Sequence, residues 1–278
     1  IESVLIPPKT AFKNDEADEE EDEQKRLTLC ISTQVGCPLD CAFCATGIMG
    51  FQRNLTAGEI VDQVLQTKKI SGRKITNIVF MGMGEPLMNY DSVMNSIDII
   101  SNGMNISSRH ITLSTAGWVG GIIRMADEGK KIKLAISLHS LDDETRTRLM
   151  PLNKKFNLQQ LMNAVEYYYR KIKIRVTFEY ILFAGMNDTE KDLKSLVKLS
   201  KTIPCKINII PFHNIGFTNP QGFAGKLHPV PVKEVEKFAH LLRKNHVTAF
   251  IRSSSGEDIA AACGQLAVLT KQKRNNDE

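Results

Sequence analysis

Residues 27–47 read LTLCISTQVGCPLDCAFCATG and join a strand-like run to a loop that holds three closely spaced cysteines. From here the chain alternates short runs rich in β-branched residues with longer helical patterns. Such alternation is typical of repeated βα units around a parallel sheet. We expect strands near residues 27–32, 75–81, 110–114, 132–138, 174–181, 207–210 and 247–251.

Helix signals lie between these runs. Thr56 and Glu59 have the spacing of a capping box, which predicts a helix after residue 56. Helical patterns also cover 158–170 and 232–244. About six βα units are too many for a small open sheet and too few for a closed eight-fold barrel. We therefore predict an α/β fold, a partial, open (β/α)6 barrel with additional strands, whose ligands bind at the carboxyl ends of its strands.

Size and hydropathy exclude several classes of protein. The chain has 278 residues, 42% of them hydrophobic, so it can bury a substantial core and is not disordered as a whole. No stretch approaches the roughly 18 uninterrupted apolar residues of a membrane helix, and residues 1–12 lack the layout of a secretory signal. We expect a soluble, cytoplasmic chain without membrane partners.

The charge is unevenly distributed. Eight of the 31 acidic residues fall within residues 15–23, which predicts a solvated, disordered loop. The rest of the chain then holds 36 basic residues against 23 acidic ones. This excess indicates an anionic partner, with nucleic acid as the first candidate, although surplus lysine also serves solubility.

Cys37, Cys41 and Cys44 form a C-x3-C-x2-C motif in a Gly- and Pro-containing loop. Structural zinc usually takes four protein ligands, and no partner pair of cysteines is visible. Three thiolates would instead leave one iron of an iron–sulfur cluster open to a substrate or cofactor. The spacing therefore favours an iron–sulfur cluster over zinc.

The segment Gly82-Met83-Gly84-Glu85-Pro86 follows a predicted strand. It lacks the third glycine of a dinucleotide-binding turn, because Leu87 stands at that position. Its glycines would let backbone carbonyls approach a ligand, and Glu85 could accept a hydrogen bond from an ammonium group. A plain strand-to-helix turn is the alternative interpretation.

Other strand ends carry polar side chains. Ser114 and Ser137 could bind a cofactor or cap helices. His139 and His213 could be ligands or satisfied structural groups, and Trp118 could stack on a base. By composition alone, Cys30 and Cys263 would be small buried hydrophobes.

The motif around Phe43, C-x3-C-x2-C, resembles the signature of radical S-adenosylmethionine (SAM) enzymes. Residues 256–266, GEDIAAACGQL, are similar to the C-terminal signature of the RlmN family, and further matches in order run from residues 1–4 to this segment. Two departures are the acidic insert between Glu2 and Cys30, and His213 where many relatives have asparagine.

The resemblance implies radical methylation of C2 of an adenosine in 23S rRNA, with a tRNA anticodon-loop adenosine as a second substrate. It implies a [4Fe-4S] cluster on Cys37, Cys41 and Cys44, and two molecules of SAM per turnover. We expect SAM to be bound by Gly84, Glu85, Ser114, Ser137, Leu138, His139 and His213, of which the Gly-Glu-Pro segment is similar to the one that holds the SAM amino group in radical SAM enzymes.

By the same resemblance, Cys263 carries the methyl group, Cys30 resolves the RNA adduct by forming a disulfide, and Glu2 accepts the proton. A related C8-methylating enzyme of the Cfr type is the nearest alternative. A non-catalytic RNA-binding protein whose three cysteines hold a structural metal is the alternative from another class.

We divide the chain into an N-terminal extension with the acidic loop at residues 1–26, a radical SAM catalytic domain at 27–268 and a polar tail at 269–278. The chain opens at Ile1, and the resemblance implies an upstream RNA-binding domain that we expect to be absent from this sequence. It also implies an electron donor such as flavodoxin, and we expect a monomer.

Overall fold

The structure is a computed structural model, and it describes residues 1–6, 26–252 and 264–266. The predicted acidic loop and the polar tail lie outside these residues.

An eight-stranded sheet forms the centre of the described chain, in the order β1-β2-β5-β6-β7-β8-β9-β10. Strands β2 to β10 of this sheet pair in parallel, and β1 pairs antiparallel with β2 at one edge. Its strands are β1 (Val4–Ile6), β2 (Thr28–Cys30), β5 (Asn77–Phe80), β6 (Ile111–Thr115), β7 (Lys133–Ser137), β8 (Val176–Leu182), β9 (Cys205–Pro211) and β10 (Ala249–Ile251).

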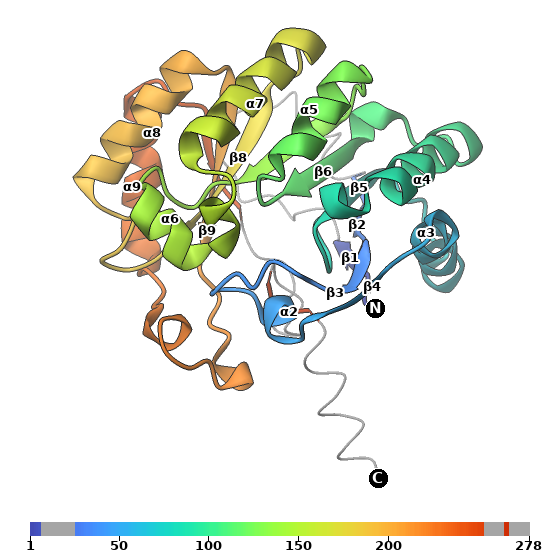
Figure 1. The fold of residues 1–278 in the computed structure, drawn as a ribbon, viewed down its shortest axis with the longest axis horizontal. Helices are drawn as coiled ribbons and strands as arrows, with labels where there is room; N and C mark the ends of the chain where they lie inside the picture. Colours follow the sequence, from blue (N-terminus) through green and yellow to red (C-terminus); the bar gives the residue numbers. More distant parts are fainter. Residues whose placement is uncertain (7–25, 253–263, 267–278) are drawn as a thin grey trace.

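Helices connect these strands and lie in an arc around the outside of the sheet (Figure 1). They are α3 (Ala57–Ser71), α4 (Tyr90–Gly103), α5 (Val119–Asp127), α6 (Asp143–Leu149), α7 (Leu158–Ile172), α8 (Glu190–Thr202) and α9 (Val232–Lys244); the short α2 (Ala45–Ile48) lies apart from the arc. Short 3-10 turns are at Pro86–Asn89, Ser108–His110, Pro151–Lys154, Gly216–Thr218 and Ala224–Lys226. The predicted partial (β/α)6 barrel with additional strands is confirmed.

Local sequence explains where several helices begin. The predicted capping box is present at α3, where the Thr56 side chain accepts from the Glu59 N–H and the Glu59 side chain accepts from the Thr56 N–H. Asn157 and Thr189 form equivalent boxes at α7 and α8. Each box satisfies backbone donors that the first helical turn leaves unpaired.

The main core lies between the sheet and the helices. On β8, Phe178 and Tyr180 pack into this core, while the alternate residues Glu179 and Ile181 belong to the opposite face. The same alternation on the neighbouring strands gives the sheet an inner face that lines the open barrel. Side chains at the carboxyl ends of this inner face form the candidate site.

Three strands were not predicted from the sequence. They are β1 and the antiparallel pair β3 (Gln34–Gly36) and β4 (Phe51–Asn54). All four residues of β4 are exposed, so this strand has no apolar alternation to reveal it. In the described part of the chain, no helix is long and apolar enough to span a bilayer.

Candidate active site

The three clustered cysteines lie in the loop between β3 and α2. Backbone bonds hold the loop: the Cys37 N–H donates to Gly50 at 3.2 Å and the Ala42 N–H donates to Leu149 at 2.9 Å. Cys37, Cys41 and Cys44 all line one pocket at the carboxyl ends of the strands. The loop therefore brings the three cysteines to the wall of one cavity.

Burial makes these thiols poor acids as they stand. It raises the pKa of Cys37 to about 12, and it raises the pKa of Cys41 well above the ordinary thiol value, with the neighbouring cysteines adding to the effect on Cys41. A bound metal displaces the thiol proton outright. Among the described residues, no three His, Cys, Asp or Glu side chains converge closely enough to hold a single metal ion.

The opposite walls of the pocket come from the ends of β5 to β9. Most residues predicted to bind SAM are brought together there: Gly84, Glu85, Ser114, Ser137 and His139 all line the pocket. Leu138 and His213 are not among its lining residues.

Glu85 joins two strand ends. Its carboxylate accepts from the Ala116 N–H at 2.7 Å and from the Leu87 N–H at 3.0 Å, and the side chain is only 2% exposed. Burial raises the pKa of this carboxyl to about 7, although the backbone donors act in the opposite direction. Glu85 therefore connects the ends of β5 and β6, and this structural role is separate from any role in ligand binding.

Gly84 is required by packing. Its φ of +99° is a conformation that side chains rarely adopt, and a Cβ would lie 2.6 Å from the Cβ of Gln34. The Gln34 side chain in turn accepts from the Glu85 N–H at 2.8 Å. The turn that contains Gly84 and Glu85 therefore packs closely against Gln34 on β3, the strand that precedes the cysteine loop.

The two serines are not helix caps. Ser114 lies within β6 and Ser137 ends β7, whereas Trp118 occupies the N-cap position of α5 and Asp142 caps α6 through its side chain. The capping interpretation is wrong because each strand and its helix are separated by a connection that supplies its own cap residue. Both serines remain candidates for ligand binding.

His139 follows Ser137 and is buried. Its Nδ1 accepts from the Ile181 N–H at 3.1 Å, and its ring meets Phe43 edge-on at 4.7 Å between centroids. Leu138 is fully buried, and its N–H donates to the Glu179 carbonyl while its carbonyl accepts from Arg146.

Cys30 and the first residues of the chain meet at the edge of the barrel. Cys30 ends β2, is buried, and is paired in register with Val4 on β1. Ser32 Oγ donates to the Glu2 carbonyl at 2.7 Å and accepts from the Met83 N–H at 3.0 Å. The 27 residues between Glu2 and Cys30 therefore do not keep the two apart in space.

Residues 264–266 pack on the cysteine loop. The Ala45 N–H donates to the Gly264 carbonyl at 2.6 Å, and the Gln265 side chain donates to the Asn214 carbonyl at 3.3 Å. Gly264 and Leu266 also line the pocket. Cys263, the residue before them, lies outside the described residues.

Comparisons with known proteins agree with this geometry. The model of the radical SAM superfamily matches residues 31–197. A probable dual-specificity RNA methyltransferase RlmN of Flavobacterium psychrophilum is 43% identical over 273 residues, which cover 96% of this chain and 72% of that protein. The RlmN of Desulfotalea psychrophila is 42% identical over 289 residues, with 98% and 73% covered.

The chain belongs to the RlmN family of radical SAM enzymes. A crystal structure of a radical SAM methyltransferase from Sphaerobacter thermophilus is similar in fold as well, with a TM-score of 0.79 and 42% identity over 86% of this chain and 70% of that one.

Membership of the radical SAM superfamily implies a [4Fe-4S] cluster and SAM. The structure fits both groups. Three cysteines line one pocket, and each cysteine of a cluster binds a different iron, so the three thiols need not converge on one ion. The same pocket holds a buried carboxylate oxygen of Glu179 that has no hydrogen-bond partner within the described chain.

Two features of this RlmN-family site escaped the sequence analysis. Arg146 on α6 is 1% exposed and donates to the carbonyls of Ala116, Ser137 and Leu138 and to the Asn153 side chain. Six of the seven residues of its helix, DETRTRL, are polar, so no apolar pattern marked Arg146 as buried. Glu179 did have a signal, because it is a charged residue inside the apolar strand VTFEYIL.

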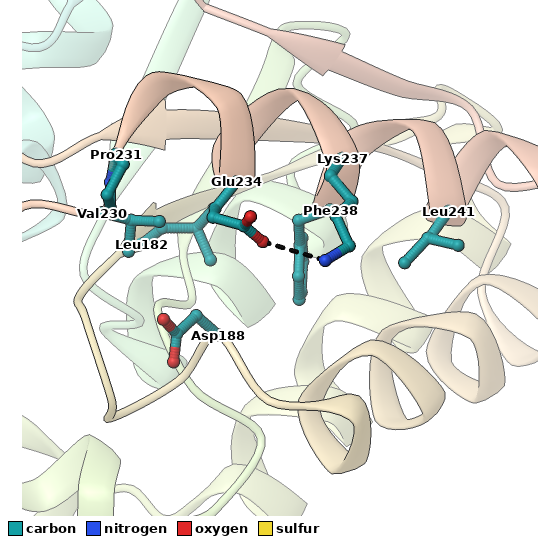
Figure 2. A pocket seen from close by; sticks show the side chains of 8 residues that line it. All are labelled: Leu182, Asp188, Val230, Pro231, Glu234, Lys237, Phe238 and Leu241. Carbon is teal, nitrogen blue, oxygen red and sulfur yellow. Dashed lines mark hydrogen bonds and ion pairs between the residues drawn. The ribbon is translucent and has the colours of Figure 1, made fainter.

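A second pocket lies outside the barrel (Figure 2). Leu182, Val230 and Phe238 form part of its wall, and Asp188 faces α9 across it. Lys237 and Glu234 form an ion pair of 3.2 Å along α9. The pocket lacks cysteine and histidine, so we assign the chemistry of this family member to the barrel pocket.

Proposed function

We propose that this chain is a radical SAM methyltransferase that methylates C2 of an adenosine in 23S rRNA, with a tRNA anticodon-loop adenosine as a second substrate. The packing of residues 264–266 against the cysteine loop carries the proposal, because Gly264 is bonded directly to Cys263. The relatives' names, which specify dual-specificity RNA methyltransferases, support the substrate class.

Two bound groups supply the chemistry. When bound, SAM would supply the methyl group, and a [4Fe-4S] cluster reduced by a donor such as flavodoxin would supply, with a second SAM, the radical that abstracts hydrogen. The residues proposed to hold the cluster are Cys37, Cys41 and Cys44. Those proposed to hold SAM are Gly84, Glu85, Ser114, Ser137, Leu138, His139 and His213.

The protein's own thiols carry the one-carbon unit. Cys263 takes up the methyl group as a thioether, and loss of one hydrogen atom leaves a methylene radical on its sulfur that adds to C2. The Cys30 thiolate then attacks the Cys263 sulfur, and the bond between that sulfur and the methylene carbon breaks as a disulfide forms. The released carbon takes up one proton to become the methyl group of the base, and the unpaired electron of the adduct leaves to an electron acceptor, a role that the oxidised cluster would fill. A thiol reductant must restore both cysteines before the next turnover.

Glu2 is proposed to accept the proton that leaves C2. The antiparallel pairing of Val4 with Cys30 and the bond from Ser32 to the Glu2 carbonyl support this role, since they hold both residues at one edge of the barrel. The proton acceptor and the resolving thiol would then act on the same adduct.

The target adenosine must leave its stack to reach a buried pocket. Trp118 is partly buried beside the end of β6, and the Lys155 ammonium lies 4.5 Å from its ring centroid. An aromatic face beside a cation suits single-stranded RNA, since bases stack on aromatic rings and phosphates attract lysine. We propose that this pair contacts RNA next to the target.

The test uses holoenzyme reconstituted with iron and sulfide, reductant, SAM and 23S rRNA fragments. Mass spectrometry of product nucleosides should show 2-methyladenosine; 8-methyladenosine would identify a Cfr-type enzyme instead. Zinc without sulfide in anaerobically purified protein would favour a metal-stabilised binding protein.

The cysteine roles have distinct signatures. Cys30→Ala should trap a covalent RNA adduct, whereas Cys263→Ala should abolish methylation while 5′-deoxyadenosine still forms. Cys205→Ala is a matched control, because Cys205 lies buried on β9 in the helix-facing core. Normal turnover by Cys30→Ala would refute its resolving role.

A further inference from the structure

Glu179 is a buried carboxylate with one unused oxygen. Its Oε1 accepts from the Asn208 side-chain amide at 2.9 Å, while Oε2 has no hydrogen-bond donor in the part of the chain that the structure describes. Arg252 Nη1 lies 3.6 Å from Oε2, within ion-pair range but beyond a good hydrogen bond. The residue is 4% exposed and lines the barrel pocket.

Such an oxygen is costly to bury. A buried acceptor without a donor loses its bonds to water and gains none in return, and proteins leave few such groups. Water-excluded pockets strengthen any bond that a bound ligand then makes. The unused oxygen therefore indicates a ligand with a hydrogen-bond donor at this place.

The sheet register identifies its neighbours. Ser137 on β7, Glu179 on β8 and Asn208 on β9 are directly paired, so their side chains form one polar row on the inner face. Ile181 and Ile210 form the next row toward the carboxyl ends, and both line the pocket. A ligand that contacts both rows must have an apolar part, which would lie against the two isoleucines, and an adjacent part with hydroxyl or amine donors, which would lie against the polar row.

Arg252 balances the negative charge of Glu179 in this row. Its backbone N–H donates to the Ile209 carbonyl, and its guanidinium lies 3.3 Å from the Met81 sulfur across the barrel. Because Arg252 already compensates the carboxylate, a neutral donor suits Oε2 better than a second cation does. This argument excludes the ammonium group of SAM and leaves its ribose hydroxyls and adenine amine.

We propose that Glu179 is a positioning residue whose Oε2 accepts a hydrogen bond from a ribose hydroxyl of bound SAM. This assignment rests on the proposed function. Acidic side chains are a common means of holding a ribose hydroxyl, and Ser137 beside Glu179 offers a further polar partner for the diol. The adenine would then contact the apolar row of Ile181 and Ile210.

Binding measurements on cluster-loaded protein test the proposal. Equilibrium dialysis would compare SAM with its 2′-deoxy, 3′-deoxy and N6-methyl analogues, for the unaltered chain and for Glu179→Gln. Loss of the relevant hydroxyl should weaken binding by about tenfold or more in the unaltered chain. In Glu179→Gln, SAM itself should bind about tenfold more weakly, and the penalty for the missing hydroxyl should largely disappear.

Thr177→Val is the matched control. Thr177 lies two residues before Glu179 on the same face of β8, it does not line the pocket, and its variant should keep the full hydroxyl penalty. Retention of that penalty in Glu179→Gln, or loss of the N6-methyl penalty in its place, would overturn the proposal.

The unaltered chain gives a test that needs no variant, because equal affinity for SAM and both deoxy analogues would also overturn the ribose assignment. Failure of the unaltered chain to bind SAM at all would count against the proposed function instead.

Discussion

The Gly264 carbonyl accepts a hydrogen bond from the Ala45 N–H at 2.6 Å, which joins the C-terminal segment to the first residue of the helix after the cysteine loop. Gly264 has a φ of +85°, and a Cβ there would lie 3.1 Å from the Phe43 carbonyl oxygen. The close approach of the two segments therefore depends on a glycine at this position.

Gly264→Ala should slow methylation by about tenfold to a hundredfold, because small displacements of a reacting group are costly to rate. Iron and sulfide content should stay unchanged, since the added Cβ would meet the Phe43 carbonyl oxygen and the Cys44 Cα but no cysteine sulfur within 4 Å among the described residues. Single-turnover assays and metal analysis would measure both.

Gly72→Ala is the control for backbone strain. Gly72 also has a positive φ, of +63°, but a Cβ there would meet nothing within 4 Å. Equal slowing by the two variants would show that strain alone, and not the contact with the cysteine loop, explains the effect.

Arg146→Met should destabilise the fold by about 3 kcal/mol, because it leaves the carbonyls of Ala116, Ser137 and Leu138 without their buried donor. Urea unfolding of cluster-free protein would measure the loss. Arg148→Ala on the same helix is the control, since Arg148 is exposed. A loss below about 1 kcal/mol at Arg146 would contradict its role as a connector of strand ends.

Glu85→Gln should lower the free energy of unfolding by about 1–3 kcal/mol even without cofactor. Both Glu85 oxygens accept backbone N–H groups, and an amide would turn its NH2 group toward one of these donors. Exposed Glu144→Gln is the control in the same urea titration. If Glu85→Gln leaves the stability unchanged, Glu85 does not stabilise the fold, and ligand binding would be its only role.

The barrel could be predicted because its signals are local. The periodic helix at α9 has the predicted bounds, and the Thr56 capping box is formed as expected. Most of the residues predicted to bind SAM, all but Leu138 and His213, also line one pocket, because parallel strands share a carboxyl edge.

The unpredicted features depend on distant partners. Arg146 is buried by its contacts with three carbonyls at the ends of two strands, β6 and β7, which no short window of sequence contains. The capping interpretation of Ser114 and Ser137 failed because spacing alone does not show how far a strand end lies from the helix that follows.

The pH dependence of stability should show that the pKa of His139 is lowered in the folded chain. Burial, with a smaller contribution from the Arg146 cation, lowers the pKa of this histidine from 6.5 to about 3. Between these values the unfolded chain binds a proton that the folded chain does not, so stability present above pH 6.5 is lost as the pH falls. By pH 5 the loss from this residue should be about 2 kcal/mol relative to pH 8.

His139→Asn separates this effect from general acid denaturation. Asparagine tolerates the φ of +57° at this position, and its Oδ1 can accept from the Ile181 N–H in place of Nδ1. Urea titrations at pH 8, 6 and 5 should show the unaltered chain losing about 2 kcal/mol more than the variant over that range. Parallel curves for the two chains would mean that His139 titrates near its ordinary pKa when folded, and that its side chain is reached by water.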